Sequence, residues 1–414
     1  MNDARAAAGP RMVTKAAPPR RAGGEANEEA ARDEPAVGLV VTGIGTVGAD
    51  GFDFRTALGR HGYKYLPAAS QYFLAAAKRA LAQAGPDALD AVGPEERGAA
   101  VGTNSAAVAL HHTMDRTVTA TGAADLSPVT APYFSINLFG SRLATEHDLK
   151  GFNLTFTSPR VAGLEALQTG QRALATGRAR RLLAGATEEA LPDGEPGADT
   201  SEAGAVALVL EPEPAARSRG VAALGRVGVR SFFLPPKAAA SAEGAEHAAA
   251  LLRDALDALG HRPDRPLAVT AVLDGSPVGE AMAAALDEKA LGGRALAGQP
   301  ERVPAGAGAL EPVARVAAAL AAPDGHPHAV VTAAAEGNAA VCLITPGDAS
   351  AIPGASAGTD ANVMPGAPAG TEASAIPGAS AGADAGAIPD TSAEADAGAG
   401  SEQPMSGRRR ASDR

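Results

Sequence analysis

The chain has 414 residues, a net charge of −11, 3% aromatic residues and one cysteine, Cys342. The modest and dispersed acidic charge argues against a nucleic-acid-binding surface. One cysteine cannot form an internal disulfide, and no CxxC or Cys/His cluster is present, so we expect a reducing cytoplasm, no metal and no cofactor. No apolar run reaches the roughly 18 residues that span a bilayer.

Both ends of the chain differ in composition from the middle. Residues 1–36 hold six basic and six acidic side chains and few large apolar ones, which predicts a disordered leader. Residues 348–414 carry a Pro/Gly/Ala-rich repeat, with nine acidic residues against four arginines and prolines twelve residues apart at Pro353, Pro365, Pro377 and Pro389. Each repeat has one large apolar residue to bury, so we expect a disordered, flexible tail.

The middle of the chain, residues 37–347, alternates strand-like and helix-like patterns, which predicts an α/β fold with both sheet faces covered. Strand-like runs lie at 38–45, 97–105, 153–157, 180–191, 203–212, 267–275, 328–335 and 338–344. Helix-like runs lie at 69–85, 245–260 and 308–322, and another follows residue 160 with Leu164, Leu167 and Leu174 among alanines.

The first strand-like run contains a glycine pattern, "VTGIGTVG", with Gly43, Gly45 and Gly48 in GxGxxG spacing. A dinucleotide site would need a helix directly after the turn and an acidic residue ending the next strand. Here "ADGFDF" follows the glycines and the next strand ends in "GTNS". The pattern therefore predicts a tight exit from the strand and not a nucleotide site.

A strand, a tight turn and a helix follow one another in "GFNLTFTSPRVAGLEALQTGQRALATG", from residue 151. Many enzymes place a nucleophile in such a turn, but the residue here is Arg160. A guanidinium group stays protonated and cannot act as a nucleophile. It also faces the positive end of the helix dipole, which disfavours a cation.

The order of several motifs resembles the β-ketoacyl synthases of fatty-acid and polyketide assembly, most closely over residues 39–212. The segments that carry the resemblance are "VVTGIGTVG", "RGAAVGTNS", "GFNLT…AGLEAL…GQRALATGRARRLLAGATEEAL" and "SEAGAVALVLEP". The resemblance implies a thiolase-like five-layer αβαβα fold with two similar halves and mixed sheets, commonly a dimer. The halves would span 37–222 and, in shortened form, 223–347.

That family condenses acyl groups with one cysteine and two histidines. By resemblance, the cysteine position falls on Arg160, the first histidine on Asp274 and the second on Arg302. Ser276 takes the place of a threonine in the family's histidine motif, and Asn338 is retained from its closing glycine-rich motif, so both are candidates for substrate binding. None of the three catalytic residues is present, and Asp274 is expected to pair with one or both arginines, because buried charges require partners.

Other reactive side chains do not supply a replacement. Cys342 lies in an apolar strand and is expected to be an inert core thiol. His111 and His112 are expected to form a surface pair. Turn chemistry explains Ser158 before Pro159 without a catalytic role.

The resemblance predicts a silent homologue that pairs with an active ketosynthase, as chain-length factors do, or with itself, through the segment Ser127–Lys150 and the adjacent strand. An acyl carrier protein with its phosphopantetheine arm would be a further partner. Two alternatives stay open. One is an acyltransferase or hydrolase with altered chemistry, and the other is a module that binds an acyl chain or a carrier protein.

Overall fold

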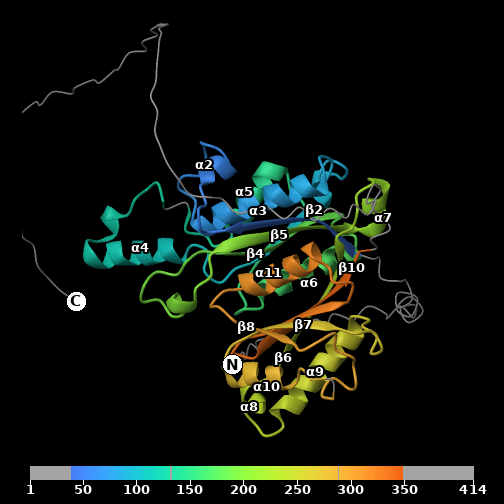
Figure 1. Ribbon diagram of the computed structural model, residues 1–414. Coiled ribbons are helices and arrows are strands. Elements are labelled where there is room, and N and C mark those ends of the chain that lie inside the picture. Colours follow the sequence, from blue (N-terminus) through green and yellow to red (C-terminus); the bar gives the residue numbers. More distant parts are fainter. Residues whose placement is uncertain (1–38, 131–132, 288, 348–414) are drawn as a thin grey trace, which may run out of the picture. The chain divides into compact units, whose positions relative to one another are not determined.

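The computed structural model describes residues 39–130, 133–287 and 289–347 (Figure 1). The predicted leader and the predicted repeat tail lie outside the described residues and stay predictions. No helix in the described part of the chain is both long and apolar enough to cross a bilayer.

Ten strands form one mixed sheet in the order β3-β2-β4-β5-β1-β6-β10-β9-β7-β8. Most of them fall where the sequence predicted strands. Their bounds are β1 Leu39–Gly48, β2 Arg97–Gly102, β3 Asn153–Phe156, β4 Arg181–Glu188, β5 Gly204–Pro212, β6 Gly225–Phe233, β7 Ala268–Leu273, β8 Glu301–Pro304, β9 His328–Ala333 and β10 Asn338–Pro346.

The sheet consists of two similar halves. In the first five strands β5 is antiparallel to β1 and β4, while β2 is parallel to β4 and β3. In the last five, β10 is antiparallel to β6 and β9, while β7 is parallel to β9 and β8, so order and direction repeat. The halves join through a short β1–β6 pairing at Val40–Arg226 and Val41–Gly225. The predicted α/β fold with two similar halves and mixed sheets is confirmed.

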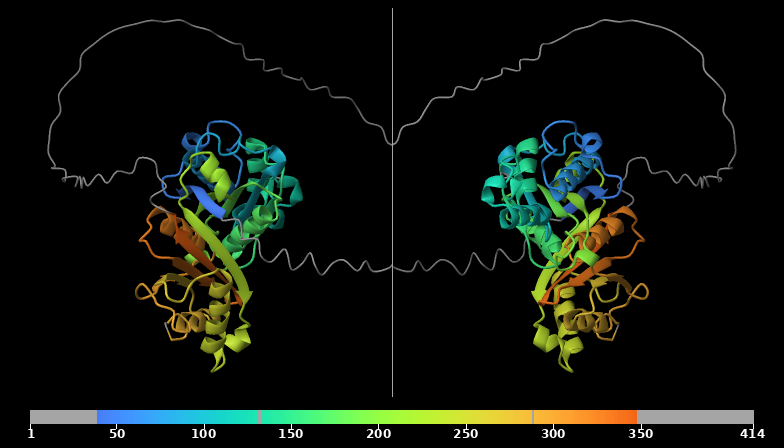
Figure 2. Two further views of the ribbon diagram at one scale, coloured as in Figure 1. Left: turned by 90° about the vertical axis from the view of Figure 1, so that its right-hand side faces the viewer. Right: turned by 90° about the vertical axis from the view of Figure 1, so that its left-hand side faces the viewer.

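The helices complete five layers, seen in Figures 1 and 2 with the first half (blue to green) above the second (yellow to orange). Helices α3 and α5 cover the outer face of the first five strands, and α9 and α10 cover that of the last five. Helices α6 and α11 lie between the halves and contact strands of both. The bounds are α2 Phe54–Ala57, α3 Ala68–Ala84, α4 Val108–Ala120, α5 Leu138–His147, α6 Ala162–Ala175, α7 Glu213–Ser218, α8 Pro236–Ala239, α9 Gly244–Ala258, α10 Pro277–Ala284 and α11 Leu310–Ala321.

The middle layer is packed tightly at the N-terminal ends of α6 and α11. A Cβ added at Gly163 of α6 would lie 2.5 Å from Val313 and 2.8 Å from the carbonyl oxygen of Ala309. Small residues therefore let the two helices approach closely, and the leucines of α6 fill the core between the halves. The first turns of both helices consequently meet at the centre of the molecule.

In the glycine pattern Gly43, Gly45 and Gly48, the first two residues serve helix packing, whereas a Cβ at Gly48 would meet open space. All three residues lie inside β1, so the predicted strand exit was wrong. A Cβ at Gly43 would lie 2.1 Å from the carbonyl oxygen of Ala80, and one at Gly45 would lie 1.9 Å from that of Ala76. Gly43 and Gly45 allow α3 to lie directly on β1, because a side chain at either position would collide with the helix backbone.

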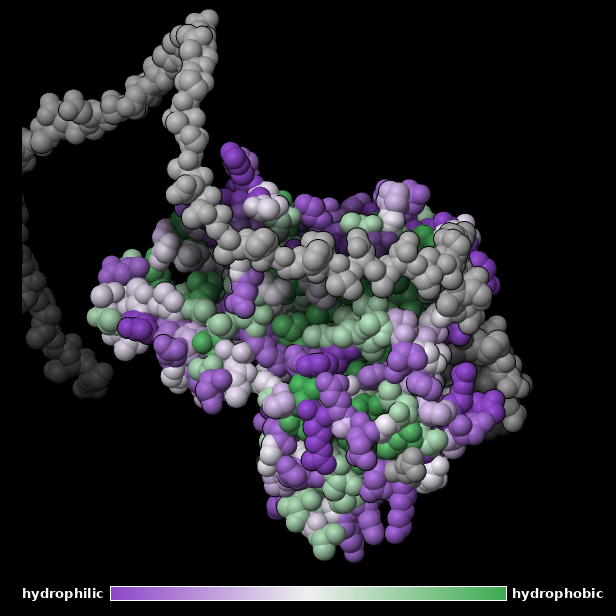
Figure 3. Space-filling view, in the orientation of Figure 1, coloured by the Kyte–Doolittle hydropathy of each residue, from purple (hydrophilic) through white to green (hydrophobic). Residues whose placement is uncertain are grey.

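Helix α4 projects from the body of the molecule (Figure 1) and contains no buried residue. The surface over α11, at the middle of the same view, is by contrast largely apolar (Figure 3). Helix α11 buries apolar residues such as Val313, Val316 and Leu320, whereas α4 makes polar contacts with neighbouring segments. His112 Nδ1 lies 2.8 Å from Glu195 Oε1, and His111 Nε2 lies 2.5 Å from the carbonyl oxygen of Phe134.

Candidate functional site

The turn between β3 and α6 holds Arg160 in a left-handed conformation, with φ of +62°. This region disfavours side chains with a Cβ. Asn104, which follows the neighbouring strand β2, stabilises the turn with its side chain. Its Nδ2 donates to the carbonyl oxygens of Thr157 at 3.0 Å and Ser158 at 3.3 Å, and its Oδ1 accepts from the backbone N–H of Arg160 at 3.2 Å.

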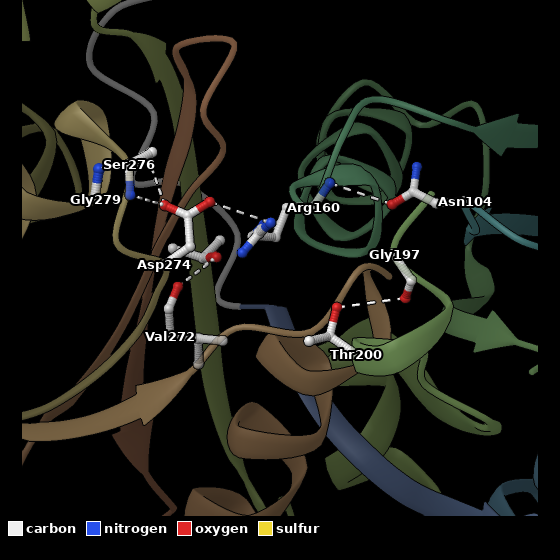
Figure 4. A network of polar contacts seen from close by, with 9 residues as sticks. Asn104, Arg160, Gly197, Thr200, Val272, Asp274, Ser276 and Gly279 are labelled. Atoms are coloured by element: carbon white, nitrogen blue, oxygen red, sulfur yellow. Dashed lines mark hydrogen bonds and ion pairs between the residues drawn. The ribbon is translucent and has the colours of Figure 1, made fainter. Parts of the chain in front are cut away.

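The side chain of Arg160 points across the halves to Asp274, in the loop after β7 (Figure 4). Arg160 Nη2 lies 3.3 Å from Asp274 Oδ2, and the two side chains are 16% and 23% exposed. The other oxygen of Asp274 accepts from the backbone N–H of Ser276 at 3.0 Å and from its hydroxyl at 2.5 Å. The carboxylate is thus fixed on one side by the loop and on the other by the guanidinium.

The guanidinium of Arg160 is only partly satisfied. Its Nε and Nη1 are buried and have no hydrogen-bond partner among the described residues. Buried donors without acceptors destabilise the folded state, and the positive end of the α6 dipole adds to this. The contact with Asp274 offsets part of that penalty.

Arg302 does not join the pair. It lies exposed on the edge strand β8, opposite Ala271 of β7, and its Nη2 donates to the carbonyl oxygen of Ala283 at 3.4 Å. Among the described residues it forms no ion pair with Asp274. The structure therefore brings together two of the three sequence-derived charges, because the β8 backbone directs the third away.

The two candidate substrate-binding residues have different surroundings. Ser276 caps α10, since its hydroxyl oxygen accepts from the backbone N–H of Gly279 at 3.1 Å while it donates to Asp274. That hydroxyl is committed to the loop. Asn338 is the first residue of β10 and is half-buried. A substrate-binding role for either residue stays a prediction.

Two carboxylates occupy the N-terminus of α11. Glu188, at the end of β4, is fully buried and accepts from the backbone N–H of Ala309 at 2.7 Å. Glu202, just before β5, accepts from the N–H groups of Leu310 at 2.8 Å and Glu311 at 3.0 Å. The first N–H groups of the helix are therefore all paired with protein carboxylates, the charge that a helix N-terminus favours.

Glu188 also ties this helix to the loop after β2. It accepts from the backbone N–H groups of Asn104 and Ser105 and from the hydroxyls of Thr103 and Ser105. Burial raises the pKa of Glu202 to about 7, an effect reinforced by the charge of Glu188 and opposed by the N–H groups of Glu311 and Leu310. Its Oε1 is buried without a hydrogen-bond partner in the described part of the chain.

The one thiol of the chain, that of Cys342, does not belong to this group of charged side chains. Cys342 is fully buried in β10, and burial strongly raises its pKa. The thiolate needed for acyl transfer is therefore not available. No group of three or more His, Cys, Asp or Glu side chains suited to a metal ion occurs among the described residues.

The site pairs a guanidinium with a carboxylate, and the nearby Ser276 hydroxyl is engaged with Asp274 and the N–H of Gly279. The sequence analysis placed Arg160 and Asp274 correctly near each other and missed Asn104, Glu188 and Glu202. Asn104 could have been found, because it follows β2, whose parallel neighbour β3 ends at the Arg160 turn, and such ends share one sheet edge. Glu188 could have been found in the same way, because it ends β4, which is also parallel to β2. Glu202 carried no comparable signal, since its partners Leu310 and Glu311 lie more than 100 residues away in the chain.

Comparisons with known proteins agree with this fold. Residues 13–214 match the family model "Beta-ketoacyl synthase, N-terminal domain". The solved structure titled the ishigamide ketosynthase/chain length factor is 23% identical, with a TM-score of 0.59 over 75% of this chain and 99% of that chain. A type II polyketide ketosynthase bound to a hexaketide, in complex with its acyl-carrier protein, is 16% identical with a TM-score of 0.59 over the same shares.

A β-ketoacyl synthase from Burkholderia phymatum is 14% identical, with a TM-score of 0.57 over 75% of this chain and 99% of that chain. No curated protein sequence matches the chain. At these identities the solved structures show a shared fold, and they confirm the thiolase-like fold that the motifs predicted.

Proposed function

Because the chain is a β-ketoacyl synthase-like protein with a thiolase-like fold, we propose that it is a non-catalytic subunit that pairs with an active ketosynthase. The observation that carries this proposal is the Arg160–Asp274 ion pair at the N-terminus of α6. A permanently charged guanidinium stands where the resemblance places the acyl-accepting cysteine, and it is held there by a partner from the other half.

An exposed apolar surface supports the pairing. We call it the β3 surface and define it as the segment Ser127–Lys150 together with β3. Seven large hydrophobic residues are exposed in the described part of the chain, and four of them belong to this surface: Val129, Phe134, Ile136 and Leu154, which are 39–58% exposed. Such a concentration is typical of a protein interface.

The edge of the sheet supports the same surface. Strand β3 is the first strand of the sheet order and has only β2 as a neighbour. Its outer backbone groups are available to a strand of another chain. The named ishigamide structure combines a ketosynthase with a chain length factor, and the second named structure contains an acyl-carrier protein. By analogy, we propose a ketosynthase as the direct partner and a carrier protein as the source of the acyl chain.

The test is co-expression with a ketosynthase of the same genome that carries the Cys-His-His set. We expect light scattering to give the mass of a one-to-one complex and the condensation products to change when this chain is omitted. A lone homodimer without effect on condensation would refute the proposal and leave the acyl-chain-binding or carrier-protein-binding module. Condensation or acyl hydrolysis by this chain alone would instead favour an enzyme with altered chemistry.

A pair of variants tests the surface. Leu154→Arg places a charge on β3, and we expect the complex to be lost because a buried unpaired charge opposes association. Phe233→Arg is the matched control, since Phe233 is 54% exposed on β6, in the other half. Loss of the complex in both variants, or in neither, would contradict an interface at the β3 surface.

A further inference from the structure

A second charged site lies at the opposite ends of the strands from Arg160, beside the first residue of β4. Strand β4 runs from Arg181 to Glu188, so its first residue is about 23 Å from the α11 N-terminus by strand rise. A cavity of about 340 Å³ opens there, between the start of β4 and helix α7. Its lining includes three basic residues, Arg180, Arg181 and Arg219.

Two of these arginines share one buried carboxylate. Arg181 is 1% exposed and pairs with Glu211 Oε2, while Arg219 is 10% exposed and places its Nη2 2.6 Å from Glu211 Oε1. Glu211 is itself fully buried and also accepts from the hydroxyl of Thr42 at 2.7 Å. Two guanidinium groups and one carboxylate leave one positive charge uncompensated in a region sheltered from water.

The other carboxylates nearby are engaged elsewhere. Glu96 lies 3.6 Å from Arg180, at the rim of the cavity. Glu213 pairs with Arg217 and Arg226, outside the cavity lining. Among the described residues, Glu211 is the one carboxylate that forms an ion pair with Arg181 or Arg219.

The donors of the two arginines are not all used. Nε of Arg181 is buried with no hydrogen-bond partner among the described residues. Arg219 donates to Glu211 and to the carbonyl oxygen of Ala84, which leaves guanidinium protons unassigned. Desolvation lowers the pKa of Arg181, against the opposing effect of Glu211, and the charge of Arg219 lowers it further. An anion in the cavity would relieve these costs together.

We propose that this cavity binds a small oxyanion of the phosphate class, held by Arg219 and Arg180 with Arg181 behind them. The planar guanidinium matches the spacing of phosphate oxygens and forms paired, charge-assisted hydrogen bonds with them. The volume exceeds that of a phosphate ion, so the site also accommodates the first atoms of a phosphate ester. The proposal does not depend on the ketosynthase-pairing function, because the site lies at the opposite end of the sheet.

The test is thermal unfolding of the full chain in inorganic phosphate and in chloride at equal ionic strength. We expect phosphate to raise the unfolding temperature in a saturable manner, as a ligand of the folded state does. Glycerol 3-phosphate, titrated in parallel, distinguishes an ester headgroup from the free ion by which of the two saturates at lower concentration. Absence of any phosphate-specific shift would overturn the proposal.

Amino-acid substitutions test whether phosphate binds in this cavity. Arg219→Gln keeps the Arg181–Glu211 pair and is expected to weaken phosphate binding tenfold or more, and Arg181→Met is expected to do the same if it folds. Arg217→Gln is the matched control, because Arg217 is 77% exposed and does not line the cavity. An unchanged phosphate response in Arg219→Gln, or an equal loss in Arg217→Gln, would also overturn the assignment.

Discussion

Helices α6 and α11 occupy equivalent places in the two halves, yet their N-termini carry opposite charges. Each follows the edge strand of its half, β3 or β8, and lies between the two halves of the sheet. At α11 the carboxylates of Glu188 and Glu202 meet the first N–H groups, as the helix dipole favours. At α6 the guanidinium of Arg160 lies against the dipole, in a strained backbone conformation.

The two helix N-termini therefore differ in their effect on the stability of the fold. Glu188 stabilises the fold by accepting hydrogen bonds from the α11 N-terminus and from the loop after β2, whereas burial of Glu202 raises its pKa and disfavours its charged form. The Arg160 turn has a left-handed backbone, two buried donors without partners and an unfavourable dipole, and it is held by Asn104 and Asp274. Strain of this kind persists where the surrounding structure enforces it, and in proteins it is concentrated at active sites, ligand clamps and switch regions.

The largest expected effect is at Glu188. Glu188→Gln replaces a carboxylate oxygen with an amide donor that faces buried N–H and O–H groups, and we expect the free energy of unfolding to fall by about 3 kcal/mol or more. Urea unfolding monitored by circular dichroism measures it. Glu246→Gln, on the exposed face of α9, is the control and should change little. A comparable small loss in Glu188→Gln would mean that the α11 cap is not stabilising.

A pH effect at Glu202 comes next. Its pKa is about 7 in the folded chain against an ordinary value of 4.5, so between these values the folded chain keeps a proton that the unfolded chain has lost. The stability from this group is complete below pH 4.5 and is lost as the pH rises through 7, a change of about 3 kcal/mol. Unfolding at pH 4.5 to 8 should show this decline in the wild type and a flatter profile in Glu202→Gln. The same dependence of the unfolding free energy on pH in the wild type and in Glu202→Gln would refute this prediction.

A smaller effect is expected at the α6 pair. A double-mutant cycle of Arg160→Gln and Asp274→Asn should give a coupling energy of about 1 kcal/mol, because the pair is mostly buried but only one nitrogen of the guanidinium contacts the carboxylate. The exposed pair Lys150–Asp148 is the control and should show no measurable coupling. Equal coupling in the two cycles would argue that Arg160 and Asp274 are neighbours by chance.

The smallest expected effect concerns the thiol. Cys342 is fully buried in the second half, so iodoacetamide should leave it unmodified in the folded chain and alkylate it after unfolding in urea. Mass spectrometry of the two samples measures the modification. Rapid alkylation of the folded chain would show an accessible thiol and would reopen the question of a displaced nucleophile.

Local sequence patterns predicted much of the layered fold. Eight of the ten strands and helices α3, α6, α9 and α11 were expected within a few residues, because alternating burial imposes strong periodicity on the chain. The pattern did not predict β6, or β8, which has four residues at a sheet edge, and it did not predict α4, whose residues are never buried. It also misplaced the end of β1, since glycines that admit a helix look like glycines that end a strand.

For the site, the sequence by itself determined that Arg160 occupies a strand–turn–helix junction, that the only cysteine sits in an apolar strand, and that no catalytic triad replaces the missing residues. Only the tertiary structure decided that Asp274 reaches Arg160 while Arg302 does not, and that Glu188 and Glu202 cap α11. The physical reason is the distance along the chain over which each kind of interaction acts. Periodicity and turn chemistry act over a few residues. Each of these charge contacts instead joins distant segments, which meet only when the two halves of the sheet pack around the central helices.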